Sequence, residues 1–455
     1  MSEVLRSVGL DVGTTSTQMV LSELTVENRA GSFSVPEMEI GQRRILYKSP
    51  VHFTPLLGGD LVDAPALRGI IAQEYERAGI CPQDVDTGAV IITGETSRKE
   101  NARAVLEQLS GFAGDFVVAA AGPDLESVLA AKGAGADLLS QRTGKTVLHM
   151  DIGGGTSNLA LIRDGRIVRT GCLNVGGRLL KFDENGIVTY VSPVLDGLCS
   201  IKPGDQPSED QLWAVAGTLV QALEMAAGLR RETELLTKLT TREAAEVFAP
   251  PGEPVTLSFS GGVADCIEKE VPWLSYGDLG PVLGRAIRQS SLCQGDYALG
   301  AETIRATVIG AGCHSAQLSG STVFHRGVTF PLKNMPVVSL DGAEQQKLSS
   351  VLPGRLAMQE STAVIALPGL EAPSYSEVTE LAGQLASICG SGPMYVCLEQ
   401  DMAKALGQAL AARLSRDTPI LCIDRVRLGE DSFLDVGAPV GPALPVVVKT
   451  LVLNN

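Results

Sequence analysis

The strongest constraint on the fold of this chain is a short pattern that occurs twice. An apolar run leads to an aspartate, a turn of glycine and threonine follows, and a second apolar run leaves the turn. The first copy is Asp11-Val12-Gly13-Thr14-Thr15 and the second is Asp151-Ile152-Gly153-Gly154-Gly155-Thr156. Such a pattern predicts a strand, a tight turn and a second strand. The copies lie much further apart than the about 20–50 residues of a solenoid repeat, so they predict two copies of one α/β domain.

The segments around the two hairpins predict an α/β fold. Apolar runs that indicate strands, as at 89–94, alternate with stretches of helical periodicity, as at 65–78. The same criteria predict a strand at 306–310. Beyond about residue 330 the strands are punctuated by proline. We expect three units, a first lobe at residues 1–145, a second lobe at 146–330 and a smaller C-terminal α/β region at 331–455.

The composition excludes several classes of partner. The 455 residues are 44% hydrophobic and 20% charged, as in an ordinary globular protein. A net charge of −15 without a basic tract predicts neither nucleic acid nor an anionic membrane as a partner. No apolar stretch reaches the about 18 residues of a membrane helix and no signal peptide is recognised, so we expect a cytoplasmic protein. The nine cysteines form no C-x-x-C pair, which favours reduced thiols over a metal site.

Both turns have the residues that a phosphate site requires. Their glycines and threonines offer backbone N–H groups and hydroxyls, and side chains this small let phosphate oxygens approach the backbone. Asp11 and Asp151 end the preceding strands and are suited to hydrated Mg²⁺, which keeps most of its waters and needs only one or two carboxylates. One such turn could be an ordinary hairpin. Two in register predict a clamp on opposite sides of a cleft.

Two other segments contain parts of different nucleotide motifs. Gly144-Lys145-Thr146 ends like a Walker A loop, but Leu139 stands where that loop needs glycine, and a strand follows instead of a helix. Gly310-Ala311-Gly312 follows a predicted strand, as a dinucleotide-binding loop would, but Ser315 stands where a third glycine is needed. Neither segment therefore predicts a phosphate site.

The hairpins resemble the two phosphate motifs of the actin-like superfamily, which includes actin, sugar kinases and heat-shock chaperone ATPases. The resemblance implies duplicated lobes of the ribonuclease H-like type that bind ATP and Mg²⁺. Ser260-Gly261-Gly262 resembles the adenosine motif of that superfamily, and Gly310-Ala311-Gly312 is a competing candidate. The residues expected at the nucleotide are Asp11, Gly13, Thr14, Thr15, Asp151, Gly153, Gly154, Gly155, Thr156, Gly261 and Gly262, with Asp11 and Asp151 as the metal ligands.

In that superfamily a carboxylate of the first lobe often positions the attacking water. Glu126, near the start of a helix predicted at 124–131, resembles that residue, and we expect it to be catalytic. The alternative is an exposed glutamate that the helix dipole favours at a helix start.

Longer phrases resemble one family of the superfamily, the reactivating factors of ethanolamine ammonia-lyase (EutA). The resemblance implies a chaperone-like reactivase with ATPase activity whose partner is ethanolamine ammonia-lyase. Such a protein releases damaged cobalamin so that intact adenosylcobalamin can bind. Association with an ethanolamine-utilisation microcompartment is an alternative to a free cytoplasmic location. The matching phrases are at residues 7–18, 91–95, 115–136, 150–158, 172–180, 308–322, 404–410 and 423–440.

Two other classes of function stay open at this point. A small-molecule kinase would use the same clamp to transfer a phosphoryl group to a substrate hydroxyl. A filament or scaffold protein would use the nucleotide only to control self-association. The sequence predicts no particular oligomeric state.

Overall fold

A computed structural model describes most of the chain. The described residues are 3–13, 16–28, 38–57, 61–92, 117–120, 123–241, 255–300, 302–314, 316–319, 322–359, 362–388, 392–426, 428–429, 432–437, 439 and 444–450.

The first lobe is built on a sheet with the strand order β3-β2-β1-β7-β8. The first three strands are antiparallel, and β7 and β8 continue parallel to β1. Helix α1 (Ala64–Ala78) packs on this sheet, where Leu67 and Ile71 join Val8 and Leu10 in the core. The strands are β1 (Glu3–Val12), β2 (Ser16–Asn28), β3 (Met38–Lys48), β7 (Thr87–Ile92) and β8 (Val117–Ala120), with β4 (His52–Phe53) paired to β2.

The second lobe repeats this topology. Its strand order is β11-β10-β9-β14-β15. Strands β11, β10 and β9 are antiparallel, and β14 and β15 continue parallel to β9. Two sheets with the same order and directions confirm the predicted α/β fold with duplicated lobes. The strands are β9 (Thr146–Ile152), β10 (Ser157–Arg163), β11 (Arg166–Leu173), β14 (Val255–Ser260) and β15 (Tyr297–Leu299).

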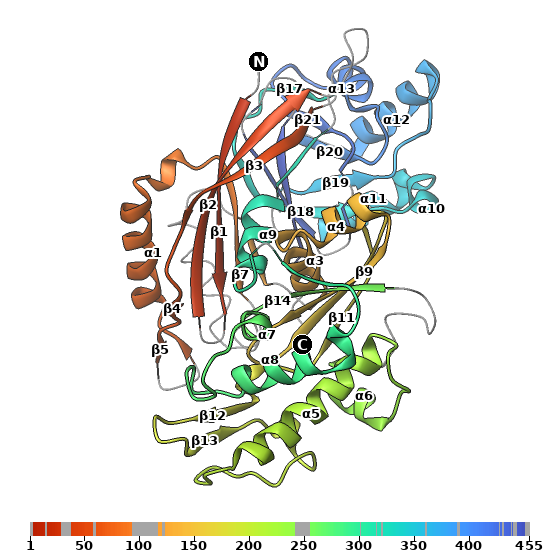
Figure 1. Cartoon of the computed structure of the whole chain (residues 1–455). Helices are drawn as coiled ribbons and strands as arrows, with labels where there is room; N and C mark the ends of the chain where they lie inside the picture. Colours follow the sequence, from red (N-terminus) through yellow and green to blue (C-terminus); the bar gives the residue numbers. More distant parts are fainter. Residues whose placement is uncertain are drawn as a thin grey trace.

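Helices and short strands cover the second sheet at the bottom of Figure 1. Helix α5 starts at a capping box in which the Ser208 and Gln211 side chains satisfy each other's backbone N–H groups. Its residues Leu219 and Leu223 pack with Met150 and Phe259 of the sheet. The elements are α5 (Glu209–Ala226), α6 (Glu234–Leu239), α7 (Asp265–Glu268), α8 (Gly280–Gln289), β12 (Leu180–Phe182) and β13 (Val188–Val191).

Two helices cross at the centre of the molecule (Figure 1). Helix α3 (Pro123–Gly133) follows β8 of the first sheet but packs on the second, and α9 (Ala306–His314) follows β15 of the second sheet but packs on the first. The strand predicted at 306–310 is therefore wrong. A short apolar run of small residues has no distinctive period, and burial against α3 stabilises the helix. Helix α4 (Ala136–Thr143) also packs on the second sheet.

The C-terminal region contains a third sheet, with the order β16-β23-β22-β18-β19-β20-β21-β17. Strands β18 to β21 are parallel, and α11, α12 and α13 pack together on one face. Two of its strands precede residue 331. The elements are β16 (Ala316–Leu318), β17 (Phe324–Arg326), β18 (Leu332–Ser339), α10 (Gly342–Gln345), α11 (Leu348–Ala357), β19 (Val364–Leu367), α12 (Tyr375–Ile388), β20 (Met394–Leu398), α13 (Ala403–Ala411), β21 (Ile420–Ile423), β22 (Ser432–Val436) and β23 (Pro445–Thr450).

The remaining elements are short. They are the hairpin strands β5 (Leu56–Leu57) and β6 (Leu61–Val62), and single 3₁₀ turns at Pro82–Asp84, Gly177–Leu179, Pro193–Leu195 and Ser291–Cys293. Within the part of the chain that the structure describes, no helix has the length and apolar character needed to cross a membrane.

Candidate functional site

The two hairpins are closed by the same hydrogen bond and have the same strand register. In the first, the Gly13 N–H donates to the Ser16 carbonyl over 2.9 Å, and in the second the Gly153 N–H donates to the Thr156 carbonyl over the same distance. The strand registers match as well, since Gln18 lies opposite Asp11 and Asn158 lies opposite Asp151. Each lobe therefore presents an aspartate and an amide side chain at the same place beside its turn.

Three carboxyl groups from different elements lie close together. Asp11 comes from β1, Asp151 from β9 and Glu126 from α3. Burial raises the pKa of Glu126 to about 8, and the negative charges of Asp11 and then Asp151 add to the shift. A hydrogen bond from the Asn158 amide opposes it. The interaction between two charges weakens with distance, so the shift that Asp11 and Asp151 cause at Glu126 indicates that both lobes and α3 meet here.

The amides opposite the aspartates each have an unused acceptor. Gln18 is 4% exposed and Asn158 is 2% exposed. Gln18 Oε1 and Asn158 Oδ1 have no hydrogen-bond partner among the described residues. Buried acceptors left without a partner are costly, and they point to a ligand that supplies donors. Waters bound to Mg²⁺ are such donors, so the residues here fit a hydrated Mg²⁺ ion held by Asp11 and Asp151.

In the glycine turn of the second lobe, the N–H groups of Gly154 and Gly155 point to the same side. The Gly153 carbonyl accepts from the Gly177 N–H over 3.0 Å, and the Gly154 carbonyl accepts from the Arg178 N–H over 2.6 Å. In a planar trans peptide the carbonyl and the next N–H point in opposite directions. The N–H groups of Gly154 and Gly155 therefore point away from this contact, as a phosphate cradle requires.

Gly154 and Gly155 differ in how much free space lies beside them. A Cβ at Gly155 would meet no atom within 4 Å, whereas a Cβ at Gly154 would lie 3.0 Å from the Arg178 side chain. A Cβ at Gly176 would come within 2.3 Å of the Gly154 carbonyl oxygen. The segment at Gly176 thus supports the turn from behind, and the side of Gly155 is open.

Gly261 brings the turn after β14 against the end of β9. It has a φ of +88°, which favours glycine, and a Cβ there would lie 2.3 Å from the Ile152 carbonyl oxygen. The Val263 N–H donates to that same carbonyl over 3.1 Å. Gly262 has open space around it. This turn therefore adjoins the residue that follows Asp151, as a contact to the nucleoside end of a bound nucleotide would need.

Gly310, in the competing segment, has a different setting. It lies inside α9, and a Cβ there would be 2.0 Å from the Leu129 carbonyl oxygen of α3. It belongs to a contact between two helices, not to a turn after a strand.

Hydroxyl groups from two elements hold Asp151. Its carboxylate accepts a short hydrogen bond from Ser260 Oγ and a long one, 3.5 Å, from Thr307 Oγ1. Burial raises the pKa of Asp151 to about 6, although both hydroxyls act in the opposite direction. Asp151 is only 7% exposed, and the two hydroxyls hold its carboxyl group in one orientation.

The first turn is fixed by a segment that follows β3. Thr54 Oγ1 donates to the Gly13 carbonyl over 2.8 Å and lies 3.0 Å from Thr17 Oγ1. Because the single Thr54 proton goes to the carbonyl, Thr17 donates to Thr54.

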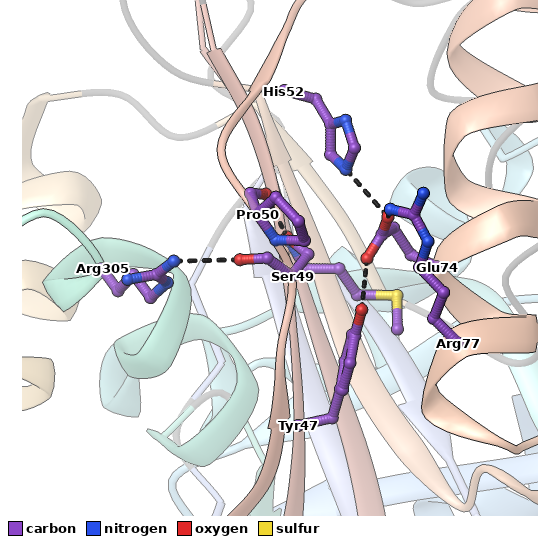
Figure 2. A network of polar contacts seen from close by, with 8 residues as sticks. Tyr47, Ser49, Pro50, His52, Glu74, Arg77 and Arg305 are labelled. Carbon is purple, nitrogen blue, oxygen red and sulfur yellow. Dashed lines mark hydrogen bonds and ion pairs between the residues drawn. The ribbon is translucent and has the colours of Figure 1, made fainter.

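A polar network anchors the same segment (Figure 2). Glu74 of α1 accepts from Tyr47 over 2.6 Å and lies 2.9 Å from His52 Nε2, while Arg77 pairs with it over 2.5 Å. Glu74 is 1% exposed, so these partners offset the cost of burying its charge.

A connection between the lobes runs through residues 302–307. Arg305 donates to the Ser49 carbonyl over 2.9 Å, as Figure 2 shows, and Lys48 pairs with Glu302. On the other side, the Gly261 N–H donates to the Thr303 carbonyl over 3.0 Å. Residues 302–307 thus touch the first lobe and the site residues of the second.

The expected site residues are only partly placed. Thr14 and Thr15 lie outside the described residues. Asp11, Gly13, Glu126, Asp151, the turn at 153–156 and the Gly261-Gly262 turn come from elements that meet around the carboxyl cluster. No group of three or more His, Cys, Asp or Glu side chains with metal-binding geometry is found among the described residues.

Sequence reasoning missed three residues of this cluster. Gln18 and Asn158 each lie seven positions after their aspartate, so alignment of the two hairpins would have found them. Ser260 was assigned only to the adenosine motif, although its side chain contacts Asp151.

Three comparisons relate the chain to known proteins. A family model described as ethanolamine utilisation protein EutA matches residues 3–454. The ethanolamine ammonia-lyase reactivase EutA of Escherichia coli (strain K12) is 39% identical over 474 residues, which cover 98% of each chain. The reactivase EutA of Salmonella typhimurium (strain LT2) is 37% identical over 472 residues, also 98% of each chain. Among solved structures, a Ppx/GppA family member of Aquifex aeolicus matches 68% of this chain and 97% of its own, with 12% identity and a TM-score of 0.41.

Proposed function

Because the chain belongs to the EutA family of ethanolamine utilisation proteins, we propose that it is an ATP-dependent reactivating factor for ethanolamine ammonia-lyase. In this proposal it releases damaged cobalamin from the lyase so that intact adenosylcobalamin can bind. We place it in the cytoplasm beside this client, and association with an ethanolamine-utilisation microcompartment is the alternative location.

One observation carries the nucleotide part of the proposal. Asp11, Glu126 and Asp151 form a single cluster at two hairpins with the same strand register. The negative charges of Asp11 and Asp151 disfavour ionisation of Glu126, and a divalent cation held by the two aspartates would offset their charge. Mg²⁺ bound there would neutralise phosphate charge and polarise the terminal phosphoryl group.

The side chains around the cluster have distinct roles in this proposal. Asp11 and Asp151 would hold the hydrated ion, and Gln18 Oε1 and Asn158 Oδ1 would accept hydrogen bonds from its waters. The positive charge of a bound ion would favour ionised Glu126, which then accepts a proton from the attacking water, while the Asn158 amide orients the Glu126 carboxylate. The N–H groups of Gly154 and Gly155 bind phosphate oxygens.

Reactivation then requires that the lyase binds two states of this protein with different affinity. The site is made from both lobes, and residues 302–307 touch both, so a bound nucleotide biases how the lobes are arranged. A ligand shifts such an equilibrium only by its difference in affinity for the two states.

The experiment is a reactivation assay. Ethanolamine ammonia-lyase is inactivated with a cobalamin that lacks its adenosyl group, and the protein, ATP, Mg²⁺ and adenosylcobalamin are then added. We expect ammonia release to return, and to stay absent without ATP. Hydrolysis of ATP without any return of ammonia release would overturn the assignment. Phosphorylation of a small substrate would then favour the kinase alternative.

A further inference from the structure

A chain of buried polar side chains lies beneath the carboxyl cluster. Ser258 Oγ is 3.1 Å from His149 Nδ1, and His149 Nε2 is 2.9 Å from Ser260 Oγ, which bonds Asp151. His149 and Ser260 are 0% exposed and Ser258 is 2% exposed. Strand register brings these side chains together, because β14 runs parallel to β9 with Ser258 beside His149 and Ser260 beside Asp151.

The number of protons on each group determines which group donates in each of these hydrogen bonds. An ionised Asp151 can only accept, so Ser260 donates its single proton to that carboxylate. The Ser260 oxygen must then accept, and the donor is His149 Nε2–H. Neutral imidazole has one donor and one acceptor, so His149 Nδ1 accepts from Ser258. The ring is fully buried, and burial disfavours a charged imidazole, so the neutral form fits this count.

Packing alone does not explain two serines, Ser258 and Ser260, at buried positions of β14. Leu257 and Phe259, their neighbours on β14, are both buried in the apolar core of the second lobe. A buried hydroxyl costs free energy unless it is hydrogen-bonded, and apolar residues would fill these places at lower cost. Ser260 also immediately precedes Gly261, which packs on Ile152.

We propose that Ser260 is a positioning residue that orients the Asp151 carboxylate for Mg²⁺-bound nucleotide, with His149 fixing the direction of the Ser260 proton. The inference rests on the proposed nucleotide function. It assigns Ser260 a role in holding the metal, beyond the backbone contact to adenosine that its motif implies. Because Ser260 and Gly261 are adjacent, this contact ties the Gly261-Gly262 turn to the metal-binding carboxylate.

The test compares Ser260→Ala with Ser258→Ala. Both changes remove one buried hydroxyl from the same strand and the same imidazole, but only Ser260 touches Asp151. Calorimetric titration with ADP is done with Mg²⁺ and again with excess chelator, and thermal unfolding of the nucleotide-free protein is followed in parallel. Groups that orient a metal ligand typically contribute about 10–100-fold to metal affinity.

We expect Ser260→Ala to weaken ADP binding by about tenfold to a hundredfold with Mg²⁺ present, and to leave the metal-free affinity unchanged. Ser258→Ala is expected to bind like the wild type in both conditions. Ser260→Cys, which keeps the size but donates weakly, is expected to fall between wild type and Ser260→Ala. It supplies the same comparison if the alanine variant does not fold.

Three results would count against the inference. Equal affinities for the two alanine variants would remove the positioning role. An equal loss with and without Mg²⁺, together with a lower unfolding temperature, would assign Ser260 to core stability only. A wild-type protein that binds no ADP with Mg²⁺ would instead overturn the proposed nucleotide function, and the inference with it.

Discussion

Gly310 of α9 lies so close to Leu129 of α3 that an added Cβ would be 2.0 Å from the Leu129 carbonyl oxygen. The contact is reciprocal, because a Cβ at Gly133 of α3 would be 1.8 Å from the Ala306 carbonyl oxygen. Backbone lies against backbone here, so no side chain can move aside to make room. The two helices that carry Glu126 and Thr307 can keep this spacing only with glycine at both positions.

We therefore expect Gly310→Ala to destabilise the protein by about 3 kcal/mol, near the upper end of the usual cost of overpacking. The control is Gly217→Ala in α5, where an added Cβ meets no atom within 4 Å. There the higher helix propensity of alanine predicts a gain of up to about 1 kcal/mol. Denaturant unfolding of both variants measures the difference, and equal stabilities would contradict the crossing geometry.

Gly155→Val tests the phosphate cradle. A Cβ at Gly155 meets no atom within 4 Å, so a valine side chain has room beside the turn, and ADP affinity should fall by about tenfold or more, or about 1.4 kcal/mol, at an unchanged unfolding temperature. Gly155 is a cleaner choice than Gly154, whose Cβ would push on Arg178. Gly295→Val, at another open glycine away from both hairpins, should bind ADP normally. Calorimetric titration is the measurement.

Asp11→Asn separates metal binding from nucleotide binding. The side chain keeps its size but loses the charge that helps to hold Mg²⁺, so hydrolysis and lyase reactivation should both fall by about a hundredfold, as on loss of one electrostatic stabiliser. ADP binding with chelator present should persist. The reactivation assay and a phosphate-release assay give the result, and a variant that hydrolyses ATP at the wild-type rate would exclude Asp11 from the metal site.

Glu126→Gln tests the proposed proton acceptor. The amide cannot accept a proton from water, so the rate of ATP hydrolysis should fall by about 10²–10⁴-fold, the usual contribution of a general base. Affinity for ADP with Mg²⁺ should remain, because the amide has the size of the carboxyl and the raised pKa of Glu126 leaves that carboxyl mostly uncharged before a ligand binds. Single-turnover hydrolysis and calorimetry distinguish these effects. Unchanged hydrolysis would support the alternative of a glutamate that only starts a helix.

Glu224 of α5 predicts an acid-sensitive contact far from the carboxyl cluster. Burial alone would raise the pKa of Glu224, but hydrogen bonds from Ser291 and Arg230 outweigh it and hold the pKa below its ordinary value of 4.5. A lowered pKa stabilises the folded state above the ordinary value, and this contribution is lost as pH falls through the folded pKa. Glu224→Gln should cost about 1.5–3 kcal/mol at neutral pH, and less at pH 3. Urea unfolding at both pH values tests this, with ADP binding as the control.

The repeated hairpins were sufficient to predict two lobes, because strand, turn and strand are local in sequence. The registers that place Gln18 opposite Asp11 and Asn158 opposite Asp151 are also local, and could have been derived from the equal lengths of the two turns. Ser260 was beyond such reasoning. Its partner strand β9 is distant in sequence, and only the parallel pairing of β14 with β9 brings Ser260 to Asp151.

The strand predicted at 306–310 was wrong for a related reason. Apolar residues without a clear period can form a buried helix or a buried strand, and the choice depends on what packs against them. Here α3 and the first sheet both pack against α9, so small residues are buried around the helix. No local signal contained that information.

The C-terminal sheet has a consequence for synthesis of the chain on the ribosome. The sheets of both lobes are complete in sequence by Leu299, whereas β16 must wait for β23 to be made before its Ala316 can pair with Val447. Domains generally fold in the order in which they are synthesised. A nascent chain that has not yet reached β22 therefore has folded lobes but a C-terminal sheet with unpaired edges at β16 and β18, which are sites for association with other chains. The C-terminal sheet is therefore the last of the three sheets to lose its exposed strand edges.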